Sequence, residues 1–338
     1  MEETNEMTTL KQIRKHFSKL GLCYFLGAVI IYVAQMAVKL PIQLFKLDWS
    51  SDVNFLILLS VLLIYLVGMP ALIAMVRTIP GQAPEKHSMK AGHFVLAAIM
   101  CFGIMYTLNF IGNAITTAIG MLKGSEVENV LSEMLTGANI PLVFLYTVIC
   151  APIMEEYVFR KLIVDRTARY GQGVAVLLSG LMFGLFHGNL GQFVYAFGLG
   201  IFLAFIYLKT GNLKITIALH MIVNVMGGVV SLLLLDAIDL EQLFAILERG
   251  ADSGALLSFY LKNIGGFLML LVYDLFVFGS ILAGIILILA AFAKKRFWLA
   301  PVEEAIPSGK RFHTVILNVG MLLYCIFWIG MIIIQLFM

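Results

Sequence analysis

Nine long apolar runs constrain this chain more than any other feature of its 338 residues. A helix needs about 20 predominantly apolar residues to cross the hydrocarbon core of a membrane, and each run approaches or exceeds that length. The sequence therefore predicts an all-α, polytopic membrane helix bundle with about nine transmembrane helices. The predicted spans are 20–44, 53–76, 91–121, 141–163, 172–189, 190–208, 213–235, 265–293 and 313–338, and the boundary near Gly188 is the hardest to place.

The composition excludes an ordinary soluble domain. Hydrophobic residues make up 61% of the chain and charged residues 13%, against roughly 45–50% and about 25% in soluble proteins. The four cysteines all fall in apolar runs, without the spacing of a zinc site or of a disulfide framework. We therefore expect Cys23, Cys101, Cys150 and Cys325 to be small core residues.

Lysine and arginine are distributed unevenly among the loops. Of the 23 in the chain, 18 lie before residue 20 or in the alternate loops that a nine-span bundle places on one side. Because cytoplasmic loops carry the excess of positive charge, the sequence predicts a multi-pass protein with its N-terminus in the cytoplasm. A bacterial plasma membrane is the expected location, although an endoplasmic reticulum membrane would show the same bias.

No linker or repeat divides the chain, so we expect one membrane domain with four parts. Residues 1–19 form a basic, amphipathic, cytoplasmic N-terminus. Residues 20–140 form three accessory transmembrane helices, and residues 141–235 form a core of four helices. Residues 236–338 form an outer amphipathic loop and two C-terminal transmembrane helices.

Three short stretches outside these spans have apolar residues at helical spacing. In the N-terminal stretch these are Leu10, Ile13, Phe17 and Leu20. They fit either a helix on an anionic membrane surface or ordinary positive flanking sequence. The outer stretches, 127–134 and the one holding Leu240, Leu243, Phe244 and Leu247, predict short helices that lie against the bilayer.

Charge is rare in the apolar runs, yet Glu155, Glu156 and Arg160 lie within two turns of one of them. A charged side chain at mid-membrane costs on the order of 2.5–3.5 kcal/mol, so such residues usually mark a functional site. Glu156 and Arg160 are four residues apart and can pair on one helix face. Glu155 points about 100° away and is free to act as a base. The alternative is a charged helix end at the inner membrane interface.

Two later runs carry polar residues that can complete a site. His187 follows Phe183 by four residues, and His220 and Asn224 share a helix face because they are also four apart. At about 1.5 Å per residue from the inner helix ends, these residues reach depths similar to that of Glu155. Peptide hydrolysis needs a water, a base and donors for the oxyanion, and the set supplies a candidate for each.

Three motifs in this order resemble the CPBP family of intramembrane proteases, which includes the CAAX proteases and the bacteriocin-processing enzymes also called Abi proteins. The motifs are E-E-x-x-x-R at 155–160, F-x-x-x-H at 183–187 and H-x-x-x-N at 220–224. Each pattern alone is weak, but three in order on successive apolar helices are specific. The resemblance covers about residues 141–235 and implies that they form a catalytic core.

The resemblance also implies an activity and a role for each motif residue. The chain would be an intramembrane endopeptidase, in which Glu155 is the catalytic base and His187 helps to hold or activate the water. His220 and Asn224 would position water or stabilise the oxyanion. The supporting residues would be Glu156, Arg160 and Phe183. The expected partners are membrane lipids and a peptide or membrane-protein substrate, with no nucleic acid, whereas the oligomeric state stays open.

Two alternatives stay open at this point. A zinc ion could be held by His187, His220 and Glu155, but we favour no cofactor, because the spacing lacks a compact pair of histidines and Asn224 is a poor zinc ligand. A non-proteolytic membrane scaffold or transporter component could also use a buried polar core. Asp274 lacks the G-x-G-D partner of aspartyl intramembrane proteases, so we expect a packed polar residue or a secondary site there.

Overall fold

The computed structural model describes residues 2–45, 52–127, 138–238, 240–248, 250 and 252–337. Over these residues the regular structure is entirely helical, which confirms the predicted class. Eight helices are long and apolar enough to cross a membrane. The run predicted at 172–189 instead forms a helix of 15 residues, Gln172–Phe186, about 22 Å long. It is shorter than predicted because Gly188, with φ of +67°, ends it.

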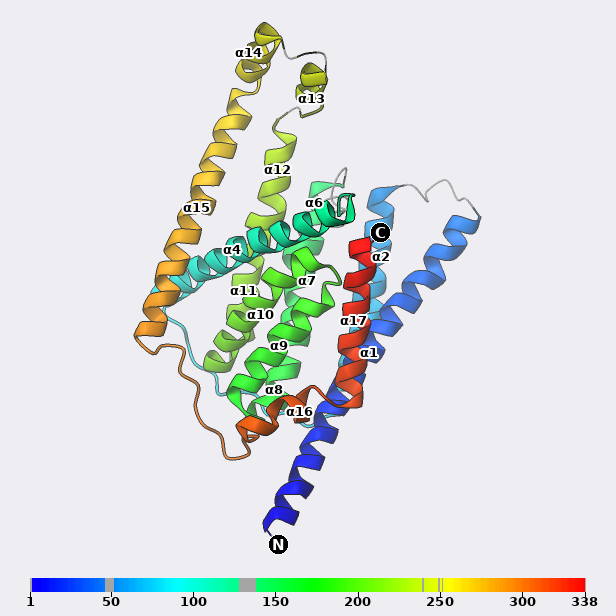
Figure 1. Cartoon of the computed structure of the whole chain (residues 1–338), viewed down its shortest axis with the longest axis vertical. Helices are drawn as coiled ribbons and strands as arrows, with labels where there is room; N and C mark the ends of the chain where they lie inside the picture. The colour runs from blue at the N-terminus through cyan, green and yellow to red at the C-terminus, as the bar shows by residue number, and fades with distance from the viewer. Residues whose placement is uncertain are drawn as a thin grey trace.

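The N-terminal part contains three long helical spans, which Figure 1 shows in blue to cyan. The second begins at Asp52, whose side chain accepts hydrogen bonds from the backbone N–H groups of Asn54 and Phe55 and so caps the helix. The elements are α1 (Glu2–Leu44), α2 (Val53–Leu63), the π-helical turn η2 (Ile64–Gly68), α3 (Met69–Arg77) and α4 (Ala91–Lys123). A short outer helix was predicted at 127–134, and its residues 128–134 lie outside the described residues.

Helix α1 runs without a break through the basic N-terminus. Ile13 and Phe17 are buried in the same apolar cluster as residues of the core helices, so this stripe packs on protein rather than on a membrane surface. Tyr24 of α1 donates a hydrogen bond of 2.5 Å to the carbonyl oxygen of Val158, and Tyr324, near the C-terminus, donates one of 2.6 Å to that of Met182. The accessory helices therefore brace the core from outside.

The residues predicted to form the four-helix core, 141–235, are helical and lie at the centre of the molecule (Figure 1), and their role as a separate core stays a prediction. Helix α10 packs against both α9 and α4. The first core span consists of α6 (Ile140–Val143), η3 (Phe144–Cys150), α7 (Ala151–Glu155), η4 (Glu156–Leu162), α8 (Ile163–Thr167) and η5 (Ala168–Tyr170). The other core elements are α9 (Gln172–Phe186), α10 (Leu190–Thr210), α11 (Leu213–Asn224), η6 (Val225–Val230) and α12 (Ser231–Asp236).

The C-terminal part begins with a hairpin of short helices at one end of the molecule and returns along α15, while α17 lies beside α1 (Figure 1). The outer stripe beginning at Leu240 forms the helix that was predicted. The elements are α13 (Leu240–Glu248), α14 (Ser253–Lys262), α15 (Ile264–Ala293), the short turn η7 (Ser308–Lys310), α16 (Arg311–Val315) and α17 (Val319–Phe337).

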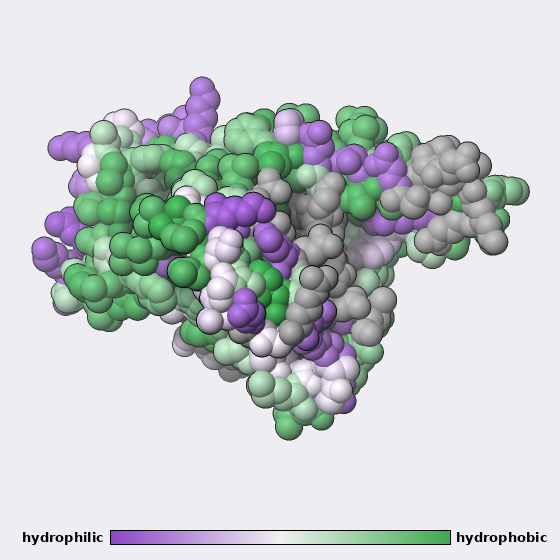
Figure 2. Space-filling model, turned by 90° about the horizontal axis from the view of Figure 1, so that it is seen from above, coloured by the Kyte–Doolittle hydropathy of each residue, from purple (hydrophilic) through white to green (hydrophobic). Residues whose placement is uncertain are grey.

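The surface is largely apolar, as a membrane protein requires. On the face seen from above, hydrophobic residues cover much of the described surface and the hydrophilic ones gather in a few groups (Figure 2). Asp274 is an exception and corrects an expectation, because it is exposed on α15 rather than packed. The reason is that α15 packs on α4 with the face that holds Ser280 and Gly284, which leaves Asp274 among exposed residues such as Leu275 and Phe278.

The loops predicted to lie on the inner side meet at one end of the bundle. The backbone N–H of Gln82 donates to the carbonyl of Asp165 at 2.6 Å, and that of His87 donates to Thr210 at 2.7 Å. The N–H of Ile306 likewise donates to Tyr170 at 3.1 Å. These segments therefore share one end, and its assignment to the cytoplasm stays a prediction.

Helices α1 and α17 approach so closely that a glycine is required between them. A methyl group at Gly320 would overlap the carbonyl oxygen of Ser18, whereas a methyl group at Gly330 on the same helix would meet nothing within 4 Å. We expect Gly320→Ala to destabilise the folded protein by about 1–3 kcal/mol through overpacking. Denaturant titration in mixed micelles measures this, with Gly330→Ala as the matched control. Equal stability of the two variants would contradict the close packing.

Candidate active site

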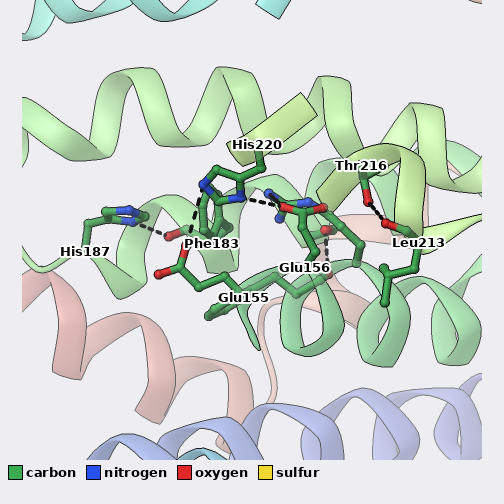
Figure 3. Close-up of polar contacts among 10 residues, drawn as sticks. Glu155, Glu156, Phe183, His187, Leu213, Thr216 and His220 are labelled. Atoms are coloured by element: carbon green, nitrogen blue, oxygen red, sulfur yellow. Dashed lines mark hydrogen bonds and ion pairs between the residues drawn. The ribbon is translucent and has the colours of Figure 1, made fainter. Parts of the chain in front are cut away.

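The three motifs converge where α7, α9 and α11 come together (Figure 3). Glu155 ends α7, and Glu156 begins the π-helical turn η4. Such turns are frequent at functional sites. His187 lies at the end of α9, and the tight turn that follows leads to Asn189, whose side chain caps α10 by accepting the N–H of Gln192. His220 projects from α11 toward the glutamates (Figure 3).

Glu156 lies at the buried centre of the cluster. Its Oε1 atom is 3.0 Å from a guanidinium nitrogen of Arg160, and both side chains are fully buried. The same oxygen is 3.0 Å from Nδ1 of His220. An ionised carboxylate only accepts hydrogen bonds, so Nδ1 carries the hydrogen and donates it. The predicted pair of Glu156 and Arg160 is therefore present, and it also orients His220.

Glu155 faces the opposite nitrogen of the same histidine. Its Oε2 atom lies 3.8 Å from Nε2 of His220, so the two glutamates lie at the two nitrogens of one ring. The side chain of Glu155 is 15% exposed, whereas that of Glu156 is 0% exposed. Glu155 is therefore the carboxylate that a water or a substrate can reach, as its position on the other helix face predicted.

Phe183 connects the first and third motifs to His187. The Arg160 guanidinium lies 4.2 Å from the centre of its ring. The rings of His187 and His220 meet it edge-on, with centroids 4.8 Å and 5.8 Å away. Its carbonyl oxygen is 2.9 Å from Nδ1 of His187. A carbonyl is an acceptor, so Nδ1 donates and Nε2 is left free for other contacts.

Asn224 lies one turn beyond His220 and is held by another part of the core. Its Nδ2 atom donates a hydrogen bond of 2.8 Å to the carbonyl oxygen of Thr147, on the π-helical turn η3 of the helix that carries Glu155. One of its two amide N–H groups is thus engaged and the other is left for a further acceptor. The bond fixes α11 against η3 and so sets the distance between His220 and Glu155.

The structure brings Glu155, Glu156, Phe183, His187 and His220 together, with Arg160 behind them and Asn224 on the adjoining turn. Their catalytic roles stay predictions. Thr216 was missed, although it was visible in the spacing T-x-x-x-H-x-x-x-N. It is fully buried beside Glu156 (Figure 3), and its hydroxyl donates to the carbonyl oxygen of Leu213.

A zinc site would need three protein ligands with a water completing the tetrahedron. Among the described residues, no three His, Cys, Asp or Glu side chains are grouped so that they could hold a metal ion. Nδ1 of His220 and Nδ1 of His187 are occupied by Glu156 and by a backbone carbonyl. Nε2 of each ring is not held in this way, and metal-ligating histidines are commonly held through their other nitrogen, so the absence of a tightly bound metal stays a prediction.

Comparison with known proteins identifies the segment that carries this cluster. Residues 137–226 match the family described as type II CAAX prenyl endopeptidase Rce1-like. This range includes all three motifs, and it confirms the resemblance that the motifs predicted. The three accessory spans and the two C-terminal ones lie outside it.

Two relatives show the same similarity. The membrane-embedded CAAX protease MroQ of Staphylococcus aureus (strain USA300) is 27% identical over 135 residues, which are 38% of this chain and 54% of that protein. The second relative is YdiL of Bacillus subtilis (strain 168), a protein provisionally named a membrane peptidase. It is 30% identical over 105 residues, which are 30% of this chain and 42% of that protein. The chain thus spans about half the length of each. No solved structure matches it.

Proposed function

We propose that this chain, which carries an Rce1-like segment, is an intramembrane endopeptidase that cleaves a membrane-associated or peptide-precursor substrate. The observation that carries the proposal is the pair of glutamates at the two nitrogens of His220, 3.0 and 3.8 Å away, inside an apolar helix bundle. Burying four ionisable groups together in a membrane costs free energy. Such groups are therefore usually found where a function requires them. The similarity to a CAAX protease supports the reaction class.

The arrangement supports hydrolysis by an activated water. Glu155 accepts the proton of a water that attacks the scissile carbonyl, and it later returns a proton to the leaving amine. His187, with Nε2 free, holds that water. His220 is kept with its Nδ1–H on Glu156, so its Nε2 faces the reacting atoms and, when protonated, donates to the oxyanion. The second amide N–H of Asn224 can donate to the same oxygen.

The other function with an observation in its favour is a membrane scaffold or transporter component, because Glu156 and Arg160 would also suit a structural polar core. Co-expression with a single-span membrane peptide separates the two. We expect the wild type to cleave the peptide and the Glu155→Gln variant to accumulate to the same level without cleaving it. A peptide that stays intact with every form of the protein would favour the scaffold.

We propose further that the water is activated without a tightly bound metal. Purified, active protein is expected to contain less than about one tenth of an equivalent of zinc by elemental analysis and to keep its activity after chelation. Stoichiometric zinc, with activity lost on its removal and regained on its return, would overturn this expectation. His187, His220 and a glutamate would then be the ligands to test by substitution.

The location is also a proposal. The positive-inside pattern and the two bacterial relatives support a bacterial plasma membrane with the N-terminus in the cytoplasm. The substrate is a peptide or membrane protein that reaches the core from the lipid phase, and lipids surround the accessory helices.

A further inference from the structure

Two tyrosines from different spans meet, one of them on the helical span that carries the proposed catalytic base. Tyr65 lies on the π-helical turn η2 of the second accessory span, and Tyr146 lies on η3, two turns before Glu155. Their ring centroids are 6.1 Å apart and the rings are inclined by 57°. The turn η2, which carries Tyr65, packs on α1, α2 and α3. The turn η3, which carries Tyr146, packs on α11 and η6. The two rings therefore bridge segments whose backbones have other neighbours.

The hydroxyl groups of this pair are available to a ligand. Within the described part of the chain, neither hydroxyl has a hydrogen-bond partner, and neither oxygen is among the fully buried unpaired atoms. Tyr146 lies nine residues before Glu155 on the same helical span, and the Glu155 carboxylate is within electrostatic reach of both tyrosines. Tyr195 on α10 is also within that reach, where its hydroxyl accepts a hydrogen bond from Gln192 at 3.1 Å and belongs to another polar group.

A substrate inside a membrane creates a need for such donors. A peptide bond must leave its helical conformation to be attacked, and its unwound carbonyl groups then cost several kcal/mol each in hydrocarbon unless they are paired. A tyrosine hydroxyl donates to a carbonyl oxygen, and its ring offers an apolar face to the neighbouring side chain. Few other side chains meet both requirements in an apolar bundle.

We infer that Tyr65 and Tyr146 form a substrate subsite in which their hydroxyls donate hydrogen bonds to the unwound backbone beside the scissile bond and their rings pack against an apolar residue next to it. This inference rests on the proposed peptidase function and deepens it. Tyr65 lies outside the Rce1-like segment at 137–226, so an accessory span would take part in substrate selection.

The test is steady-state cleavage in proteoliposomes of single-span peptides that carry a fluorophore and a quencher on either side of an apolar segment. We expect Tyr65→Phe and Tyr146→Phe each to raise KM about tenfold, because each loses one hydrogen bond that a buried carbonyl needs. The value of kcat should stay within about twofold, since the bond serves substrate and transition state alike. Tyr65→Leu also loses the ring and should raise KM further.

The controls separate this subsite from the function on which it depends. Tyr260→Phe, at a 48% exposed position on α14, should leave both KM and kcat unchanged, and thermal unfolding should show that every variant is folded. If cleavage needs Glu155 but Tyr65→Phe and Tyr146→Phe behave like Tyr260→Phe, the subsite is wrong and the peptidase stands. If the wild type cleaves no peptide, or Glu155→Gln cleaves as well as the wild type, the peptidase and the subsite fail together.

Discussion

The Glu155→Gln variant is expected to cleave a membrane peptide about a thousandfold more slowly than the wild type, within the range that general-base catalysis contributes. Gln keeps the size of the side chain but cannot accept the proton of the attacking water. The protein should remain folded, because Glu155 is partly exposed and its contact with His220 is 3.8 Å long. The rate is measured under single-turnover conditions in proteoliposomes, with enzyme in excess.

Asp274→Asn is the matched control for that variant. It makes the same chemical change to an acidic residue in another apolar span, on the exposed face of α15. We expect its rate to stay within about twofold of the wild type, because the Asp274 side chain is exposed, whereas its neighbour Tyr273 is the residue that bonds to the core, at Met226. A comparable loss of rate in both variants would show that the effect at Glu155 is not specific to the site.

The second large effect concerns stability. Arg160→Met should destabilise the folded protein by about 3–5 kcal/mol, because it leaves the fully buried carboxylate of Glu156 without its charge partner. It also removes the guanidinium from the Phe183 ring, which it approaches to 4.2 Å. The double variant Glu156→Gln with Arg160→Met should recover most of this loss. Denaturant titration in mixed micelles measures the free energy of unfolding.

The adjacent ion pair provides the control. Lys161 and Asp165 are also four residues apart on this helical span, but the lysine side chain is 35% exposed, and the buried Asp165 carboxylate also accepts a hydrogen bond from Tyr207 at 2.8 Å. Lys161→Met should therefore cost no more than about 1 kcal/mol. If Arg160→Met lowers the free energy of unfolding no more than Lys161→Met does, the buried pair does not stabilise the fold as proposed. Another residue would then have to hold Glu156 in place against His220.

The sequence was sufficient for the features that depend on local pattern. Apolar runs long enough to span a membrane predicted the helices, and the spacing of four residues correctly paired Glu156 with Arg160. Gly188 marked a real boundary, although the helix before it ends sooner than predicted. These properties follow from helix periodicity and backbone freedom, which neighbouring residues determine.

Features that depend on packing between distant segments were not predictable in this way. Nothing in the spacing indicates that Glu155 and Glu156 lie at opposite nitrogens of His220, because that depends on how α11 lies against η4. Tyr65 belongs to no motif, and it meets Tyr146, on the span that carries Glu155, only through the folding of an accessory span. Asp274 was expected to be a packed polar residue or a secondary site, yet it is exposed, because the face of α15 that meets α4 is set by Gly284 and its close approach to Gly103.

The most direct test of the central claim is the position of the cut. Reconstituted wild-type protein and the Glu155→Gln variant are incubated with the same single-span peptides, and the product termini are identified by mass spectrometry. We predict new termini within the apolar segment of the peptide, formed by the wild type and absent with Glu155→Gln. Termini confined to the polar flanks, or apolar-segment products that form equally with Glu155→Gln, would contradict hydrolysis inside the membrane by the Glu155 site.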